Sequence, residues 1–246
     1  CQGPEALPQR SLGAPGVIFT GYRTLGSLWH REDLLRPASR PWITDLSVLC
    51  PVKGLQPGNL PEFGSDPEWA AWSIGDTPSD AKLALGWLEF RDGPRRMLVA
   101  DRMLMSRVSW ADLDEAGFVS GRVVRIDGRG FRVRLLTGGR SARDDPMNGA
   151  REPNEWDRLL SGEIVGAPRP EAADHDAPLS RAHMRSAHNA AWNWFAAVSW
   201  TQEPCLNRAD GRVCRGYHGP LFFYTNTVDH RHEDIGWRPV LEADDE

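Results

Sequence analysis

Apolar and polar residues alternate most regularly in the middle of the chain, and this pattern predicts two β-hairpins. The runs GRVVRI and GFRVRLL place apolar and basic residues in turn on either side of Asp127-Gly128, a dipeptide that favours a two-residue hairpin turn. The runs LALGWLEF and RRMLVADRML flank RDGP at residues 91–94, which is a second turn signal. An earlier apolar run, VIFTGY at residues 17–22, is a further strand candidate.

Helical spacing replaces this alternation in a few short segments. In VSWADLDEAG, Ser109 can cap a helix that ends at Gly117. In NEWDRLL, Asn154 is the expected cap. The apolar face of this second helix consists of Trp156, Leu159 and Leu160. Two more helices are predicted, one at residues 66–72 after an Asp-Pro start and one at residues 180–192.

Four strand-like runs close the chain: AAVSWTQE, GRVCRGYH, PLFFYTNT and IGWRPVLE. The segment is rich in aromatic, hydroxyl, amide and imidazole side chains, the types that make contacts in binding sites. Neighbouring side chains of a strand point to opposite faces, so one of Phe223 and Tyr224 is expected in the core. Two interpretations stay open at this point: a hairpin with its aromatic residues packed inward, or a recognition surface held on a rigid frame.

Composition bears on the domain organisation. A chain of 246 residues can bury a core without disulfide bonds. Residues 1–16, with three prolines and three glycines, are expected to be an extended N-terminal segment, and residues 17–246 a single domain. The totals of 24 Gly, 19 Pro and 11 Trp suit a loop-rich structure, and residues 26–78 are expected to be a long loop region.

Charge and hydropathy limit the partners. A formal charge of −5 without a basic cluster gives no reason to expect nucleic-acid binding. No apolar run approaches ~20 residues, so no membrane-spanning helix is expected. All basic residues except Lys53 and Lys82 are arginines, a bias that fits a GC-rich genome and also hints at a thermophile.

The cysteines do not form a metal motif. Cys205 and Cys214 fit neither a CxxC pair nor a zinc cluster, and a disulfide bond between them stays open. Cys214 lies near Arg212 and Arg215, which would lower its pKa and make it a nucleophile candidate; burial in a strand is the preferred alternative. Cys1 fits either a fragment of a longer protein or the acylated first residue of a lipoprotein.

Histidines gather late in the chain. His230 and His232 are two apart and would lie on the same side of a strand, where Asp229 or Asp234 could help them bind a metal. No third ligand is placed by spacing, so we interpret both as exposed polar residues of a loop. The sequence therefore predicts no metal site and no cofactor.

Several motifs resemble the formylglycine-generating-enzyme (sulfatase-modifying-factor) group. RVRLLTGG followed by NEWDRLL resembles its RLPTEAEWE signature with an insertion between the halves, and VSWADLDEAG is similar to its VSW-x-DA segment. RGYHG and DIGWRPVLE resemble its closing RGGSW and GFR strands. The resemblance covers about residues 83–241. It implies an α+β, C-type-lectin-like fold: a small twisted antiparallel sheet, two main helices and much ordered coil. It leaves open an oxidase that uses Cys205 and Cys214.

A closer resemblance is to the variable proteins of diversity-generating retroelements, the non-enzymatic branch of that fold. In this family the C-terminal segment is rewritten by adenine-specific reverse transcription, which turns AAY codons for Asn into codons for many residues but never for Trp, Glu or Lys. The frame residues implied here are Trp192, Trp194, Trp200, Trp237, Arg238 and Pro239. The implied variable, ligand-binding face, at about residues 190–235, consists of Phe195, Ala196, Ala197, Tyr217, His218, Gly219, Leu221, Phe222, Tyr224, Thr225, Asn226, Thr227, Asp229, His230, His232 and Asp234.

This resemblance implies a binding protein and not an enzyme. Its partner would be a protein or other surface ligand whose identity selection decides, and its expected setting is a virion or a bacterial cell surface. Neither calcium nor carbohydrate binding follows from the fold. The alternatives are the oxidase and a structural module of a prophage.

Overall fold

The computed structural model describes residues 16–37, 72–160, 164–168, 197–232 and 234–243. These residues form a strand-rich α+β fold with two short helices, which confirms the predicted class. The predicted extended segment and the helix predicted at residues 180–192 lie essentially outside the described residues. No described helix is long and apolar enough to cross a membrane.

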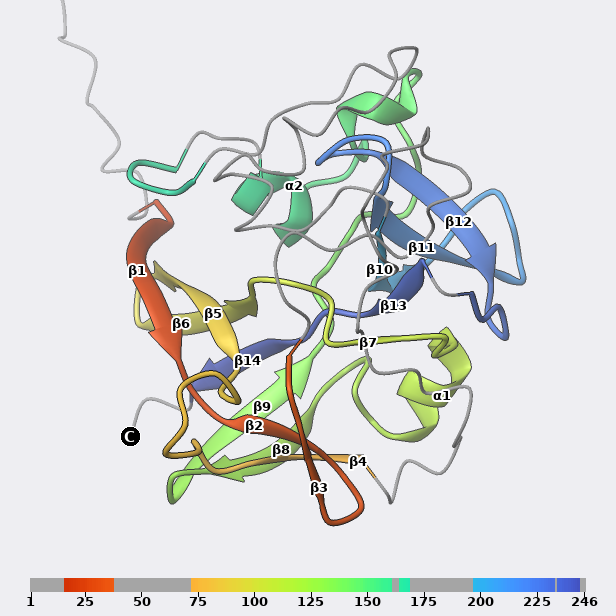
Figure 1. Ribbon diagram of the computed structural model, residues 1–246. Helices are drawn as coiled ribbons and strands as arrows, with labels where there is room; N and C mark the ends of the chain where they lie inside the picture. Colours follow the sequence, from red (N-terminus) through yellow and green to blue (C-terminus); the bar gives the residue numbers. More distant parts are fainter. Residues whose placement is uncertain (1–15, 38–71, 161–163, 169–196, 233, 244–246) are drawn as a thin grey trace, which may run out of the picture.

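The larger sheet has six strands in the order β1-β5-β6-β14-β9-β8, and every neighbouring pair is antiparallel (Figure 1). Its strands are β1 (Ile18–Thr24), β5 (Gly86–Asp92), β6 (Arg95–Ala100), β8 (Arg122–Ile126), β9 (Arg129–Arg134) and β14 (Val240–Ala243). Both predicted hairpins are confirmed. Asp127 and Gly128 have φ values of 51° and 77°, and a type I′ turn requires positive φ at both positions.

The second sheet has five strands in the order β12-β11-β10-β13-β7. They are β7 (Met105–Ser106), β10 (Val198–Pro204), β11 (Gly211–Gly216), β12 (Phe223–Thr227) and β13 (Ile235–Trp237). Three of the predicted closing runs therefore form adjacent strands. The pair β10–β13 is parallel, whereas the other pairs are antiparallel.

The fourth closing run, IGWRPVLE, is not one strand as predicted but two, in different sheets. β13 lies between β10 and β7, and β14 lies between β6 and β9. Arg238 and Pro239 connect them, and Pro239 has no N–H to continue a ladder. A side chain at Gly236 would collide with the main-chain carbonyl of Met105, so glycine is what allows β13 to approach β7.

The region predicted as one long loop also contains strands. β2 (Ser27–His30), β3 (Asp33–Leu35) and β4 (Trp72–Gly75) form a small antiparallel sheet. The turn between β2 and β3 carries a positive φ at Arg31, where no Gly or Asn signals it in the sequence. Trp72, the only described residue of the helix predicted at residues 66–72, belongs to β4 instead.

Both helices have the predicted caps. α1 (Trp110–Glu115) begins after Ser109, which forms a capping box with Asp112. α2 (Glu155–Leu160) begins after Asn154, whose Oδ1 accepts a hydrogen bond of 2.8 Å from the Asp157 N–H. The buried residues of α2 are Trp156, Leu159 and Leu160, as predicted.

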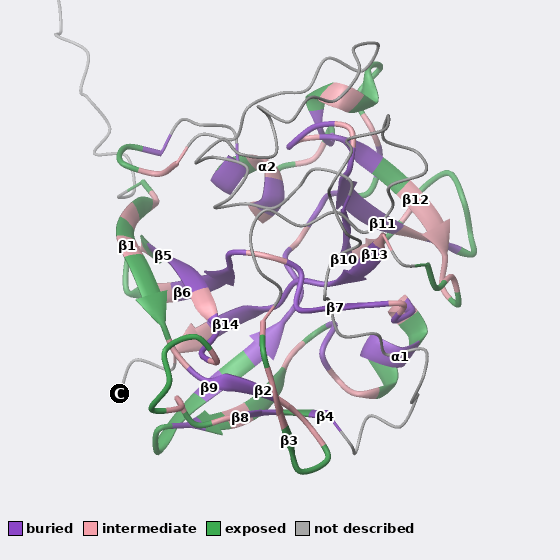
Figure 2. Cartoon of the chain, viewed as in Figure 1, coloured by how far each residue is buried: buried purple, intermediate pink, exposed green. Residues whose placement is uncertain are grey.

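One hydrophobic core connects the two larger sheets. It contains buried residues from Leu28 to Leu241, among them Trp87, Trp156 and Trp237 (Figure 2). A smaller cluster of Ala150, Val213 and Phe223 lies on the opposite face of β11 from Cys214, which belongs to the main core.

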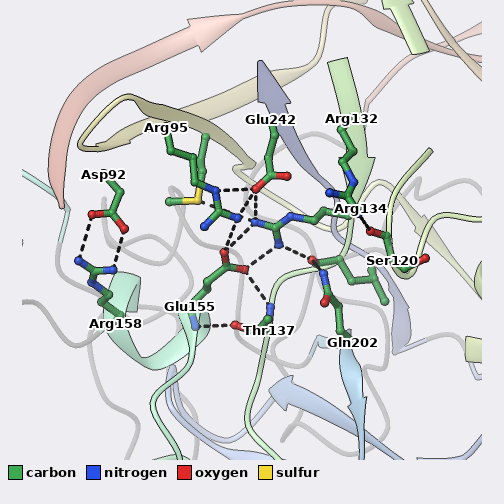
Figure 3. Close-up of polar contacts among 12 residues, drawn as sticks. Asp92, Arg95, Ser120, Arg132, Arg134, Thr137, Glu155, Arg158, Gln202 and Glu242 are labelled. Atoms are coloured by element: carbon green, nitrogen blue, oxygen red, sulfur yellow. Dashed lines mark hydrogen bonds and ion pairs between the residues drawn. The ribbon is translucent and has the colours of Figure 1, made fainter. Parts of the chain in front are cut away.

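An ion-pair network fixes α2 to the larger sheet (Figure 3). Arg134 of β9 is only 4% exposed and donates hydrogen bonds of 2.7 Å to Glu155 of α2 and to Glu242 of β14. Arg95 of β6 contacts the same two carboxylates. Thr137 and Glu155 exchange hydrogen bonds, each accepting from the other's main-chain N–H. Residues 134–137 therefore meet the start of α2 although 17 residues separate Thr137 from Glu155.

Candidate functional site

One open pocket of about 400 Å³ lies at the end of the second sheet. Its described lining comes from β10, from β12 and from the two loops that flank β12, at residues 217–222 and 228–234. The lining residues are Val198, Tyr217, His218, Phe222, Tyr224, Asn226, His230, His232 and Asp234. We call this the C-terminal pocket.

Aromatic rings form one side of the C-terminal pocket. The His218 ring packs edge-on against Tyr217 and against Phe222, with centroid distances of 4.8 and 4.9 Å. Phe222 is stacked with Tyr224 at 6.2 Å. Tyr224 is 47% exposed, whereas Tyr217 and Phe222 are buried. Four consecutive rings therefore run from the core to the surface.

Tyr217 has an unusual backbone conformation. Its φ is 84°, in a region that residues with a side chain seldom adopt. Such positions persist only when the surroundings hold them, and they concentrate at functional sites.

The loop at residues 217–222 is held by buried groups that contact its main chain. Arg215 of β11 donates hydrogen bonds to the carbonyls of Leu221 and Phe222, at 2.7 and 3.2 Å. The Trp156 indole donates to the Pro220 carbonyl at 2.7 Å. Arg215 is fully buried and also forms an ion pair with Asp157. The position of this loop is therefore fixed through carbonyl groups that every residue type carries.

The loop at residues 228–234 is fixed to α1 and to Arg107, the residue after β7, whose N–H donates to the His232 carbonyl. Arg231 donates to both carboxylate oxygens of Asp112, at 2.9 and 2.6 Å. Burial opposes ionisation of Asp112, but hydrogen bonds from Arg231 and Ser109 outweigh it and hold the pKa of Asp112 below its ordinary value. The Ala111 N–H donates to the Val228 carbonyl. The helix cap of α1 is thus also the anchor of the loop that carries His230 and His232.

Polar groups line the rest of the pocket. The rings of His230 and His232 stack at 6.3 Å. His232 Nδ1 lies 2.8 Å from an Asp234 carboxylate oxygen. The Asn226 amide nitrogen lies 3.9 Å from Cys214 Sγ, which is buried beneath it. His230 and His232 lie in a loop and not in a strand, as the preferred interpretation of the sequence had it; His232 is exposed and His230 is half-buried.

The structure brings together half of the predicted ligand-binding residues. Eight of the sixteen line the C-terminal pocket: Tyr217, His218, Phe222, Tyr224, Asn226, His230, His232 and Asp234. Asp229 is exposed beside it, and a hydrogen bond from the Thr227 side chain lowers the pKa of Asp229. Phe195 and Ala196 lie outside the described residues.

The other predicted positions are elsewhere. Ala197 is 1% exposed and Gly219 is buried, so neither lies on an open face, and Leu221 packs against the main core. Thr225 and Thr227 alternate with Tyr224 and Asn226 along β12 and therefore point to its opposite face. The set of residues that AAY mutagenesis can produce includes these residues and the pocket residues alike. Whether a side chain lines the pocket depends instead on its direction in the folded chain.

Val198 is the pocket residue that the sequence did not indicate. It is an apolar residue at the start of a predicted strand, and it is 5% exposed. Nothing in its local pattern separates it from a core residue. A hydrogen bond of 2.7 Å from its N–H to the Asp234 carbonyl joins β10 to the pocket loop.

The two described cysteines are free thiols and are not arranged as a pair. Cys205 packs against the cluster that contains Val213, whereas Cys214 faces the main core from the other side of β11. Burial raises the pKa of the Cys214 thiol strongly. The hypothesis of a reactive Cys214 with a lowered pKa is therefore wrong, and its alternative, burial in a strand, is confirmed.

The described residues contain no group of three or more His, Cys, Asp or Glu side chains placed to hold a metal ion. Comparisons of the chain with protein-family models, curated proteins and solved structures find no match.

Proposed function

We propose that this chain is a ligand-recognition protein of C-type-lectin-like fold, whose C-terminal face is varied by a diversity-generating retroelement. In this proposal it is a binding protein and not an enzyme. Its partner is a protein or other ligand exposed on a surface, and the chain is displayed on a virion or a bacterial cell.

One observation carries the proposal. Residues predicted to vary, from two loops and the strand between them, line a single pocket, while the groups that hold those loops are different residues. Arg215 and Trp156 hold the first loop, and Arg231 and Asp112 hold the second. Exposed substitutions away from such ties usually change stability by only about ±0.5 kcal/mol. The side chains of such a face can be replaced while the backbone of its loops stays in place.

The contacts around α2 support the C-type-lectin-like assignment. The motif that resembles RLPTEAEWE is split by residues 140–153, yet its two halves are joined by Arg134, Thr137 and Glu155 (Figure 3). The insertion therefore leaves from and returns to the same place. This is the arrangement expected if the two halves form one structural unit.

The oxidase alternative receives no comparable support. It requires Cys205 and Cys214 to act together, and these thiols lie on opposite faces of β11. Cys214 is also kept protonated by its burial.

A combinatorial library tests the proposal. His218, Tyr224, Asn226, His230 and His232 are replaced together by residues that AAY mutagenesis can produce. We expect most members to remain folded, with melting temperatures within a few degrees of the parent, because the loops are held by main-chain contacts. The readout is the fraction of members that resist proteolysis and melt cooperatively.

The matched library replaces Trp156, Arg215 and Arg231. Most of its members should fail to fold, because removing Arg215 alone leaves the partly buried carboxylate of Asp157 without its charged partner, at a cost of about 3 kcal/mol or more. Equal losses in both libraries would contradict a tolerant face. In the genome, a neighbouring reverse-transcriptase gene and an adenine-rich near-copy of the 3′ end are expected.

A further inference from the structure

The C-terminal pocket joins aromatic faces to hydrogen-bond acceptors, and its described lining contains no lysine or arginine. Tyr217, Phe222 and Tyr224 contribute rings, and Asp234 contributes a carboxylate. Ring faces carry negative electrostatic potential and attract cations within about 6 Å of the ring centre. These rings and this carboxylate are therefore complementary to positive charge.

Two polar residues of the pocket, Asp234 and Asn226, can accept hydrogen bonds from a ligand. Asp234 uses one carboxylate oxygen in its contact with His232, and its side chain is 19% exposed. Asn226 uses its amide nitrogen toward Cys214, which leaves its carbonyl oxygen as an acceptor. Both residues line the pocket, where these oxygens are the candidate acceptors for a donor that enters it.

Two arginines that hold the pocket loops are each paired with a carboxylate. Arg231 is paired with Asp112, and Arg215 is paired with Asp157 beneath the loop. Asp229, exposed in the same turn as His230, adds negative charge near the mouth of the pocket. The charges of these two arginines are thus balanced locally, whereas Asp234 lines the pocket.

We infer that the C-terminal pocket binds an organic cation, meaning an ammonium or guanidinium group carried on an apolar body. This inference rests on the proposed function and states what the present pocket recognises. The volume of about 400 Å³ suits a small headgroup or one long side chain. The charge lies against Asp234 and the ring face of Tyr224, and the apolar body packs on Phe222.

Choline and its uncharged isostere 3,3-dimethyl-1-butanol provide the test. Binding to the whole chain is measured by calorimetry or NMR titration at about pH 8, where imidazole side chains are ordinarily neutral. Choline should bind at least about tenfold more tightly than the isostere, since one cation–π contact with a desolvated charge contributes up to about 2 kcal/mol. N-acetyl-arginine methylamide is the second probe, and it shows whether the pocket prefers a peptide side chain to a quaternary headgroup.

The variant Asp234→Asn keeps the shape of the side chain and removes its charge. It should weaken binding of the preferred cation at least about fivefold and leave the isostere unchanged. The control variant is Asp114→Asn, an exposed acid on α1, which should leave both affinities unchanged. Melting curves confirm that both variants are folded.

Two results would overturn the inference: both cations bind no better than the isostere, or Asp234→Asn binds cations as well as the parent does. If either result is found while most members of the five-residue library still fold, the cation inference fails and the proposed display function stands. If most members of that library fail to fold but the parent binds cations selectively, the proposed display function fails and the cation inference stands.

Discussion

Phe223 and Tyr224 are adjacent on β12 and have opposite environments. Phe223 is 6% exposed and packs against Ala150 and Val213, whereas Tyr224 is 47% exposed at the edge of the C-terminal pocket. The alternation of a strand required one of the two to be buried, and this expectation is confirmed. The local sequence did not identify which, because that depends on the register of β12 with β11.

The two residues should respond differently to truncation. Phe223→Ala is expected to lower the unfolding free energy by about 3 kcal/mol, because it opens a cavity in the smaller cluster. Tyr224→Ala should cost less than about 1 kcal/mol, since much of its ring already contacts water. Denaturant titrations of both variants measure the difference. Similar losses would mean that Tyr224 has a structural role and does not belong to a replaceable face.

One side chain, Arg231, connects the loop after β12 to α1. Arg231 links this loop to Asp112, which also caps α1. Two elements distant in the sequence therefore share one anchor.

Replacing this anchor should loosen both elements. Arg231→Gln is expected to lower the unfolding free energy by about 1 to 2 kcal/mol, because Asp112 loses its charged donor. Amide hydrogen exchange should speed up at residues 228–234 and at the start of α1 and should remain unchanged in β5 and β6. Arg125→Gln, an exposed arginine on β8, serves as the control and should have no effect. Uniform acceleration across the chain would indicate global destabilisation instead.

Elements with a local signal were predictable. Asp127-Gly128 specifies its hairpin, and Ser109 and Asn154 specify their helix starts, because these residues act on the backbone next to them. The division of residues 235–242 between two sheets has no local signal. It depends on Gly236 fitting against Met105, and that contact exists only in the folded chain. Eight of the nine described pocket residues belong to the set that the family resemblance implied, but the resemblance did not separate them from the implied residues that lie elsewhere, and it missed Val198.

The stability of the whole molecule is expected to depend on pH in the acid range, because arginine–carboxylate pairs connect its strands and helices. Burial opposes ionisation of Glu242, but hydrogen bonds and charge from Arg134 and Arg95 outweigh it and lower its pKa to about 2. Glu89 and Asp112 also have lowered pKa values for the same kind of reason. The folded protein thus binds fewer protons than the unfolded chain. Stability is complete above the ordinary carboxyl pKa of 4.5 and falls as the pH decreases toward 2.

The variant Glu242→Gln should show this dependence directly. Its unfolding free energy should be lower than that of the parent at pH 7, and the difference should shrink between about pH 4.5 and pH 2 as the parent protonates. Glu115→Gln, an exposed acid on α1, should follow the parent at every pH. Urea titrations across this range provide the measurement, and a constant difference between Glu242→Gln and the parent would show that the ion pair does not cause the acid loss.

The position of β13 and β14 has a consequence for how the protein is made. Both strands follow the pocket loops in the chain, and each lies inside a sheet between two partners translated earlier. Neither sheet can be completed until the ribosome has translated the segment proposed to vary, because the strand that joins its two parts is still missing. A copying error that shifts the reading frame there would therefore yield a chain that lacks β13 and β14. Both sheets would be incomplete, and cellular proteases would degrade the chain. Folding itself would then act as proofreading, so that only in-frame versions of the pocket reach a partner.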